Sequence, residues 1–561
     1  MTNSTYEKFI DGELFEKLVL CGACNLKAHI KTVNDLNVFP IPDGDTGDNM
    51  YMTISGGLGG LKSVKENSVC KKAQALAKGM LLNARGNSGV ILSQLFSGMA
   101  NGFKDGETAT VKILGEAFVQ GVKQAYSSVA QPVEGTILTV ARESAEYALK
   151  KCDENTTVCE FFHNCVKEMK ASLKRTPELL EALKEAGVID SGGAGLLYIT
   201  EGMESAAEGK DVDEVAFTQI ETEDEKSVDF SNFNENSVMT FGYCTECLLQ
   251  LQTCKTDVNA FDINTIIKFL ETIGDSIVAF KTGTVIKLHV HTMTPYKVLE
   301  FCQQYGEFLT IKIENMTLQH SETGEDFALN KPKKPKVKKE HKKHALVTVG
   351  TGEGLINTFY ECGADVVIDG GQGKNPSIED FIDAFDELDA ENIYVLPNNS
   401  NIIMAAKQSS SMYDKAKIHI VPTKNFGHAY AILSMLDYSA DDPEVIVQEM
   451  VEEMSCATTG MVTTSIRDAN IDSVEIKNGD YIGFTDKTMQ VSASDKVSAL
   501  VGLADKLCAG EKSIIIVVYG KTVTDEEKAK TSASISEKYP NQEFYELDGG
   551  QDVYEFILIM E

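Results

Sequence analysis

The sequence lacks long apolar runs and the features of a secreted framework. No stretch of its 561 residues approaches the roughly 18 apolar residues of a membrane-spanning helix, so we expect no transmembrane segment. The first residues, Met1–Lys8, are polar and contain no apolar targeting core. The thirteen cysteines have no framework spacing, which predicts reduced thiols in a cytoplasmic protein. Tryptophan is also missing, but that absence excludes no function.

Basic charge is scarce as well. Acidic residues number 84 against 52 basic ones, which leaves a net charge of −32. That balance argues against general binding of nucleic acid or of an anionic membrane. One basic run, Lys331–His344, is stiffened by two prolines. We interpret it as a solvated tether between acidic domains, with a contact to lipid headgroups or nucleic acid as the alternative.

Two common nucleotide-binding motifs are absent, namely Gly-x-x-x-x-Gly-Lys-Ser/Thr and Gly-x-Gly-x-x-Gly after a strand. In their place the chain has Leu36-Asn-Val-Phe-Pro-Ile-Pro-Asp-Gly-Asp-Thr-Gly-Asp-Asn-Met50, where Asp43 and Asp45 flank a glycine. The prolines exclude helix, so the two carboxylates lie on a constrained turn of the kind that Mg²⁺ shares with phosphates. Further oxygen donors crowd the same turn: Asn37, Thr46, Asp48 and Asn49. The alternative is a solvated turn that binds nothing.

Three further polar segments rich in glycine lie between helical stretches: Ala84–Gln94, Pro132–Leu138 and Ala186–Gly195. The first places two glycines and a serine before an apolar helical run. Such a helix start offers free backbone N–H groups to a phosphate. Four polar glycine turns in one helical domain would be an unusual way to build inert loops.

In this order and spacing, the four segments resemble the DhaL-like (DAK2) nucleotide-binding domain of dihydroxyacetone kinases. The whole chain resembles the ATP-binding subunit of bacterial fatty acid kinases, and the stretch from Asn37 to Gly47 is specific to that resemblance. It implies that Asp43 and Asp45 bind Mg²⁺ ions that bridge the phosphates of ATP. Dihydroxyacetone kinases carry a third Asp upstream, where this chain offers only Asn37.

The resemblance also assigns residues to the nucleotide. It places Ser88 and Gly89 on the phosphates, Thr136 near the nucleotide, and Asp190 in the loop that closes over it. The remaining residues that we expect to bind the cofactor are Asn37, Thr46, Asn49, Asn87 and Gly192.

Composition and periodicity divide the chain into three domains. An acidic connector, 204–228, and the basic run separate them. Apolar residues at helical spacing predict an all-α domain over 1–205, which the resemblance makes a DhaL-like helical barrel. Short β-like runs around two helices predict a small α+β domain over 229–330. Alternating strand and helix patterns over 345–561 predict an α/β domain with one parallel or mixed sheet, similar to the DegV/EDD fold.

The middle domain carries a second chemical signal, Lys287-Leu-His-Val-His291. In a strand, His289 and His291 lie on the same face, and two imidazoles with a cysteine can bind Zn²⁺. Fatty acid kinases are similar both here and at Cys244, the expected third ligand. Cys247 is an additional thiol that could close the site as a fourth ligand. The alternative is a pair of surface histidines.

Three other features of the helical domain have simpler interpretations. Arg175, before Thr176-Pro177, could grip a transferring phosphoryl group, or be a surface arginine near a helix end. Cys21 and Cys24 share one helix face and are interpreted as core packing. His29 is interpreted as a packed or solvated histidine.

In the C-terminal domain, polar segments follow three predicted strands: Gly370–Ser377, Leu396–Asn401 and Val421–Lys424. Strand ends of this kind bind ligands in α/β sheets, so the residues alone favour a second active site. The resemblance instead implies a vestigial site or a surface that docks a separate fatty-acid-binding protein of the DegV family, rather than independent catalysis.

The expected activity is transfer of the γ-phosphoryl of ATP to the carboxylate of a fatty acid presented by that partner, giving acyl phosphate and ADP. His289, His291 or Arg175 would meet the carboxylate. The alternatives are a dihydroxyacetone-type kinase and a nucleotide-sensing regulator without transfer activity. A homodimer is expected from the family alone.

Overall fold

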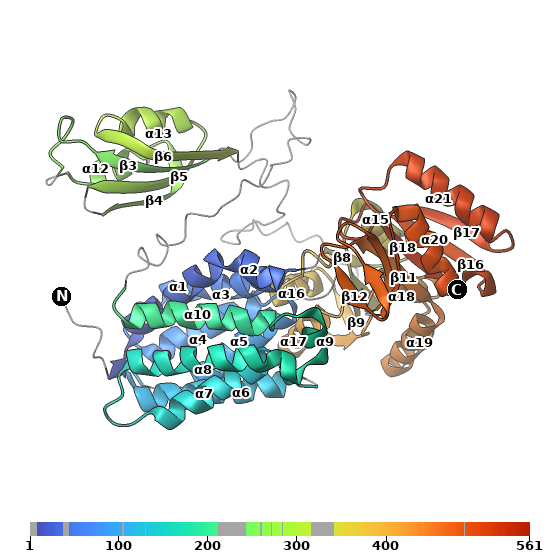
Figure 1. The fold of residues 1–561 in the computed structure, drawn as a ribbon, viewed down its shortest axis with the longest axis horizontal. Coiled ribbons are helices and arrows are strands. Elements are labelled where there is room, and N and C mark those ends of the chain that lie inside the picture. Colours follow the sequence, from blue (N-terminus) through green and yellow to red (C-terminus); the bar gives the residue numbers. More distant parts are fainter. Residues whose placement is uncertain are drawn as a thin grey trace. The chain divides into compact units, whose positions relative to one another are not determined.

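The computed structural model describes most of the chain. The described residues are 8–37, 44–103, 106–129, 131–210, 243–258, 261–270, 272–282, 284–315, 341–440, 442–486 and 488–561. They form two compact units (Figure 1). One combines Met1–Thr222 with Lys338–Glu561, and the other is Glu223–Val337. The helical and C-terminal domains therefore belong to one unit, and the middle domain is a unit of its own.

The first domain is helical, as predicted. Its helices are α1 (Gly12–Ala28), α2 (Ile30–Asp35), α3 (Thr46–Ser63), α4 (Val69–Leu82), α5 (Gly86–Gly102), α6 (Val111–Ser128), α7 (Ile137–Lys151), α8 (Val158–Leu179), α9 (Glu181–Ala186) and α10 (Ser191–Ala207). A short ribbon of β1 (Phe9–Ile10) and β2 (Ala109–Thr110) pairs antiparallel. Most helices begin at a polar capping residue, which satisfies N–H groups of the first turn.

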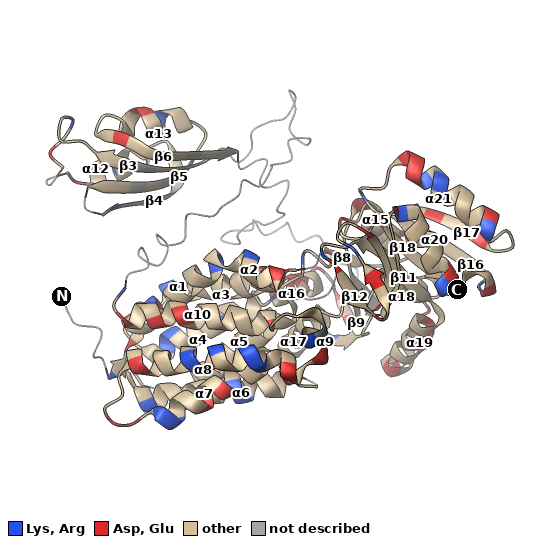
Figure 2. Ribbon diagram, in the orientation of Figure 1, with Lys and Arg blue, Asp and Glu red and all other residues tan. Residues whose placement is uncertain are grey.

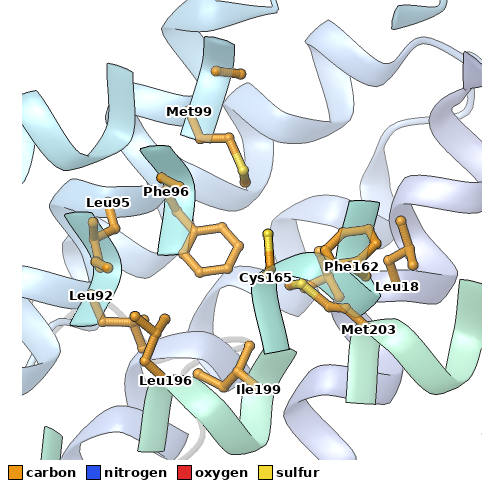
Figure 3. Close-up of a cluster of buried hydrophobic side chains, with 14 of the residues drawn as sticks. Leu18, Leu92, Leu95, Phe96, Met99, Phe162, Cys165, Leu196, Ile199 and Met203 are labelled. Atoms are coloured by element: carbon orange, nitrogen blue, oxygen red, sulfur yellow. The ribbon is translucent and has the colours of Figure 1, made fainter. Parts of the chain in front are cut away.

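The core of this domain consists of apolar side chains at helical spacing. Figure 3 shows Leu18 of α1, Phe96 of α5, Phe162 of α8 and Met203 of α10 in one cluster. Each fully buried side chain of this size contributes about 1.5–3 kcal/mol relative to exposure. Cys21 is fully buried in the same core, which confirms its interpretation as a packing residue.

The middle unit is a four-stranded antiparallel sheet with the order β4-β5-β3-β6, which confirms the α+β prediction. Its elements are β3 (Tyr243–Leu251), α12 (Asn264–Leu270), β4 (Gly274–Thr282), β5 (Val285–Thr292), α13 (Pro295–Cys302) and β6 (Gly306–Asn315). Alternate residues of β3 and β5 pack with both helices in one apolar cluster: Cys247, Leu249, Leu251, Ile286, Leu288 and Val290.

The C-terminal domain contains two main sheets, where the sequence predicted one. A parallel sheet has the order β10-β9-β7-β8, and a mixed sheet has the order β15-β14-β11-β18-β16-β17. The first is built from β7 (Lys342–Gly350), β8 (Val366–Asp369), β9 (Ala390–Leu396) and β10 (Lys417–Ile420), with α15 (Glu353–Glu361), α16 (Ile378–Asp386), α17 (Ile403–Met412) and α18 (Phe426–Ser434) between and after them.

The second sheet takes the remaining strands. They are β11 (Thr458–Thr464), β14 (Tyr481–Thr485), β15 (Thr488–Ala493), β16 (Ile514–Tyr519), β17 (Glu543–Asp548) and β18 (Phe556–Met560), accompanied by α19 (Pro443–Cys456), α20 (Lys496–Lys506) and α21 (Asp525–Lys538) and by a hairpin of β12 (Ala469–Ile471) and β13 (Val474–Ile476). β16 belongs to this sheet because it pairs with β17 and β18. The α/β class is confirmed; the single sheet is not.

The distribution of charged residues and the apolar content of the helices both agree with what the composition predicts. In the view of Figure 2, basic residues are interspersed with acidic ones on α6, α7 and α8. Among the residues that the structure describes, no helix is both long and apolar enough to cross a bilayer.

Candidate functional site

Each of the four polar glycine segments opens a helix. Asp45 precedes α3, Arg85 precedes α5, Thr136 precedes α7 and Asp190 precedes α10. Thr136 and Asp190 cap their own helices by accepting from Leu138 N (3.4 Å) and Gly193 N (2.6 Å). Asp45 and Arg85 do not cap their own helices in this way. In α3 the N–H of Gly47 donates to Asn34 Oδ1 at 2.7 Å, whereas no side chain caps the first turn of α5. The start of α5 therefore offers its N–H groups to an anion.

These helix starts lie together at one end of the domain. Ser191 of α10 donates to Thr46 of α3 at 3.3 Å, and the backbone N–H of Arg85 donates to Thr53 of α3 at 3.3 Å. Gly192 packs on Ile137 of α7, where an added Cβ would lie 3.2 Å from the isoleucine Cβ. The positive ends of four helix dipoles thus converge, which favours a multiply charged anion such as a triphosphate.

The glycines at this end allow close helix packing. A Cβ on Gly89 would lie 2.4 Å from Thr53 Oγ1, so α5 can approach α3 only with glycine there. Gly86 has a φ of +57° and sits against Asn49. Packing therefore explains why Gly89 is glycine, and its contact with phosphate stays a prediction. Ser88 is half-buried on the first turn of α5.

The metal-binding turn is described from Gly44 onward, and Asp43 lies outside the described residues. Asp45 is half-buried, while Thr46 and Asn49 are buried beside it. Asp48, in the first turn of α3, accepts from Asn34 Nδ2 at 2.7 Å. Among the described residues, no three His, Cys, Asp or Glu side chains form a metal cluster. Mg²⁺ usually takes one or two protein carboxylates plus water and phosphate oxygens, so this hard-oxygen set fits it.

Asp190 is a half-buried structural cap. Burial raises the pKa of its carboxyl group to about 6, against the opposing effect of hydrogen bonds from the N–H groups of Gly193 and Ile137. Its own N–H donates to Thr176 on α8 at 3.2 Å. The carboxylate therefore ties the starts of α7 and α10 to each other, close to the expected nucleotide.

Arg175 is engaged by two carboxylates. Its guanidinium donates to Glu143 at 2.6 Å and to Glu168 at 2.8 Å, and its side chain is 43% exposed. Both contacts neutralise the positive charge of Arg175. The arrangement therefore favours a structural role for this residue, as an ion pair that links α8 to α7. The contact with a phosphoryl group stays a prediction. His29 stacks on Tyr198 with ring centroids 3.9 Å apart, which confirms the packed-histidine interpretation.

In the middle unit, backbone register brings the predicted zinc ligands together. Cys244 of β3 pairs with His291 of β5, and Glu246 pairs with His289. The side chains of these four residues lie outside the described set, so zinc binding stays a prediction.

Cys247 is not a fourth ligand. It lies on the other face of β3, because it is three positions along the strand from Cys244, and it packs in the apolar core. Burial raises the pKa of its thiol to about 12, which keeps it protonated, whereas zinc binds thiolate.

The C-terminal domain reaches the turn that is predicted to bind metal, a contact that no pattern in the sequence indicates. Asn375 donates its amide N–H to the Asp45 carboxylate, and Arg467 donates to the backbone carbonyl of Asn37 at 2.6 Å. Arg85 donates to the carbonyl of Asn375 at 3.0 Å. The loop 370–377 was recognisable as a strand-end segment, but nothing local indicated that it meets Asp45. Asn87, expected on the nucleotide, donates to Asn401 of the same domain at 3.3 Å.

Known families match the chain in three consecutive parts. Residues 40–205 match the DAK2 domain, 240–323 match the middle domain of the FakA-like fatty acid kinase proteins, and 345–561 match the C-terminal domain of the same proteins. The chain is 37% identical over 558 residues to protein YloV of Bacillus subtilis (strain 168), covering 98% of this chain and 99% of YloV. It is 35% identical over 557 residues to an uncharacterised protein of Staphylococcus aureus (strain USA300), with the same coverage of both chains, 98% and 99%.

Solved structures resemble single parts of the chain. A dihydroxyacetone kinase from C. freundii, in complex with AMP-PNP and Mg²⁺, covers 35% of this chain with 34% of its own, at 18% identity and a TM-score of 0.28. A fatty-acid-binding DegV family protein from Thermus thermophilus covers 39% with 100% of its own, at 13% identity and a TM-score of 0.30. Scores this low carry no argument about activity. Similarity to YloV over nearly the whole chain, with three matched domains in order, shows that this chain belongs to the FakA-like family of fatty acid kinase proteins.

Proposed function

We propose that this chain is the ATP-binding subunit of a fatty acid kinase. In this proposal it transfers the γ-phosphoryl group of ATP to the carboxylate of a fatty acid, giving acyl phosphate and ADP. The observation that carries the proposal is the convergence of four helix starts beside Asp45, in a member of a fatty acid kinase-like family. A fatty acid carboxylate is already ionised at neutral pH, so transfer needs charge neutralisation and in-line positioning more than a base.

The roles within the helical domain follow from this geometry. Asp45, with Asp43 by resemblance, would hold Mg²⁺, which neutralises charge on the transferring phosphoryl group and its leaving oxygen. The N–H groups at the start of α5, at Asn87 and Ser88, would hold phosphate oxygens. Thr136, Asp190 and Gly192 would shape the opposite wall of the nucleotide site. Burial of Thr46 and Asn49 supports their orientation toward this end.

The acceptor side of the reaction is assigned to the other domains. Cys244, His289 and His291 would bind Zn²⁺, and the site would meet the incoming carboxylate. The pairing of Cys244 with His291 across β3 and β5 supports this assignment. The C-terminal α/β domain would dock a DegV-family fatty-acid-binding partner. The described cysteines are all free thiols, in keeping with a cytoplasmic protein, and we include homodimerisation in the proposal.

The experiment is an assay of acceptor dependence. The purified chain is incubated with ATP and Mg²⁺ plus oleate-loaded DegV-family protein, plus dihydroxyacetone, or plus neither, and ADP and hydroxylamine-trapped acyl phosphate are measured. We expect both products only with the loaded carrier. Turnover with dihydroxyacetone alone would establish the ketose kinase instead. ATP binding without turnover in any mixture would establish a nucleotide sensor.

A further inference from the structure

The C-terminal domain packs directly on the start of α5. Ala84 and Val90 are fully buried in one apolar cluster with Ile378 and Phe381 of α16 and Ala405 of α17. Beside this cluster, Arg85 and Ser377 form an antiparallel backbone bridge. Gln94 of α5 and Gln408 of α17 are within hydrogen-bond distance at 3.5 Å. The contact is therefore a continuous domain interface with its own apolar core.

From this interface, two polar side chains reach the residues on either side of 38–43. Arg467, in the segment between β11 and β12, donates to the carbonyl of Asn37 at 2.6 Å. Asn375 donates to the carboxylate of Asp45, 330 residues away in the chain. Both ends of the metal-binding turn are thus attached to the C-terminal domain.

The amide of Asn375 is held in one orientation. The residue is 2% exposed, and its Oδ1 accepts from Asn399 Nδ2 at 3.3 Å. Only the amide nitrogen then remains for Asp45, and only a donor can serve a carboxylate. The carbonyl of Asn375 is fixed in turn by Arg85. A buried network of this kind is rigid, because moving one side chain would leave a buried polar group without a hydrogen bond, which costs free energy.

We propose that Asn375 and Arg467 are positioning residues for the metal site, so that the C-terminal domain completes the Mg·ATP site. The inference rests on the proposed function, because it takes Asp45 as a metal ligand. A carboxylate has about four lone-pair directions, so the hydrogen bond from Asn375 leaves room for a metal on the same group. Hydrogen bonds of this kind orient metal-binding carboxylates, and their loss typically lowers metal affinity about 10–100-fold.

The test measures how ATP binding depends on Mg²⁺ concentration in the full-length chain. Asn375→Ala and Asn375→Leu remove the donor, the second while filling the space, and Arg467→Met removes the other attachment. The control is Gln408→Ala, which loosens the same interface without touching Asp45 or Asn37. Isothermal titration of ATP at several Mg²⁺ concentrations is compared with titration in EDTA. Circular dichroism and thermal unfolding check the fold.

We expect Asn375→Ala and Asn375→Leu to raise the Mg²⁺ concentration for half-maximal ATP binding by about tenfold or more. Arg467→Met should change it in the same direction, and Gln408→Ala should leave it unchanged. ATP binding in EDTA should be the same in all variants, because these substitutions act through the metal site. A general loosening of the domain would weaken ATP binding in EDTA as well.

Three results would overturn the inference: an unchanged Mg²⁺ dependence in the folded variants, tighter Mg²⁺ binding, or equal losses with and without metal. Asp45→Asn separates this failure from that of the proposed function. If Asp45→Asn loses Mg²⁺-dependent binding while the Asn375 variants do not, only the positioning role fails. If Asp45→Asn binds Mg·ATP normally, the metal assignment itself is wrong.

Discussion

At the scale of single residues, the site depends on carboxylates in two contrasting environments. Asp45 is half-buried, at the start of a helix without a side-chain cap, and it accepts from Asn375. Asp190 is half-buried as well, but its carboxylate accepts from the N–H of Gly193 and serves as a cap for α10. The first environment suits a group that shares an ion with a ligand. The second suits a group that holds backbone in place.

Replacing Asp45 by Asn should leave the fold intact and abolish Mg·ATP binding. The substitution would remove one anionic ligand from the Mg²⁺ that would shield the phosphates of ATP from their mutual repulsion. Isothermal titration calorimetry measures the binding, and Asp35→Asn, an exposed acid at the end of α2, is the matched control. Near-normal affinity in the Asp45 variant would show that this residue binds no essential metal.

Replacing Asp190 by Asn should change how stability depends on pH. The folded pKa of about 6 lies above the unfolded value of about 3.9. The folded state therefore holds the proton more tightly, and wild type loses stability relative to the variant as pH rises from 4 to 6. Above pH 6 the variant should be more stable by about 2–3 kcal/mol, since one pKa unit corresponds to about 1.4 kcal/mol and Asn also caps helices well.

Urea unfolding of both proteins without Mg²⁺ or nucleotide, at pH 4 and pH 7.5, measures this difference. Only the first unfolding transition is compared, because a chain of several domains need not unfold in one step. A stability difference that is the same at both pH values would contradict the raised pKa of Asp190.

At the scale of elements, close contact between helices gathers the polar helix starts. The start of α5 lies against α3 because Gly89 has no side chain, and the start of α10 lies against α7 at Gly192. In the middle domain, the pairing of β3 with β5 brings the backbones of Cys244 and His291 side by side.

Replacing Gly89 by Ala should destabilise the helical domain by about 1–3 kcal/mol and weaken ATP binding, because the added Cβ would lie 2.4 Å from Thr53 Oγ1. Gly59→Ala on the exposed side of α3 is the control, since nothing lies within 4 Å of its added Cβ. That substitution should stabilise by up to about 1 kcal/mol, as expected for an exposed helical glycine. Thermal unfolding compares the two, and equal shifts would refute the packing explanation.

The β3–β5 pair should hold about one Zn²⁺ per chain, through Cys244, His289 and His291. Elemental analysis of the purified protein measures the metal. Cys244→Ala, His289→Ala and His291→Ala should each lose it, and the histidine variants should impair phosphotransfer more than nucleotide binding. Cys247→Ala is the control on the opposite face of β3 and should retain zinc. Protein without zinc, together with full activity in the histidine variants, would restore the interpretation as surface histidines.

At the scale of the whole molecule, the first and third domains form one unit, although the middle domain lies between them in the sequence. Binding of ATP at the proposed nucleotide site and binding of the proposed partner at the C-terminal domain can therefore influence each other. If they do, the coupling is reciprocal by thermodynamic linkage.

Cutting the chain within the basic run should separate two properties. The piece 1–330 should still bind ATP, because all four polar glycine segments lie before residue 196, but it should need more Mg²⁺ than the full chain because Asn375 and Arg467 are gone. It should fail to phosphorylate carrier-bound fatty acid at ordinary concentrations, and high carrier concentration should restore part of the turnover.

Adding 345–561 as a separate protein should lower the Mg²⁺ requirement of 1–330 toward that of the intact chain. ATP titrations and turnover assays on the two pieces measure these effects. If 345–561 alone bound and hydrolysed ATP, the active site would lie in the C-terminal domain instead.

The sequence by itself determined the elements and much of the candidate site. Periodicity predicted the helical domain and the α+β class of the middle domain, and glycine with polar residues marked all four helix starts. Strand alternation placed His289 and His291 on one face. The same rule, applied to the three-residue step from Cys244 to Cys247, places Cys247 on the opposite face and excludes it as a zinc ligand. These properties depend on neighbours within a few residues, which a sequence displays directly.

Only the tertiary structure decided how distant segments meet. Two sheets replaced the predicted single sheet because strand order depends on pairing between β16, β17 and β18, which local pattern does not encode. The structure also decided that Arg175 lies between two glutamates and that Asn375 meets Asp45 across 330 residues. The physical reason is that such contacts arise from packing of whole domains, here of α5 on α16 and α17, and no periodicity within either segment specifies its partner.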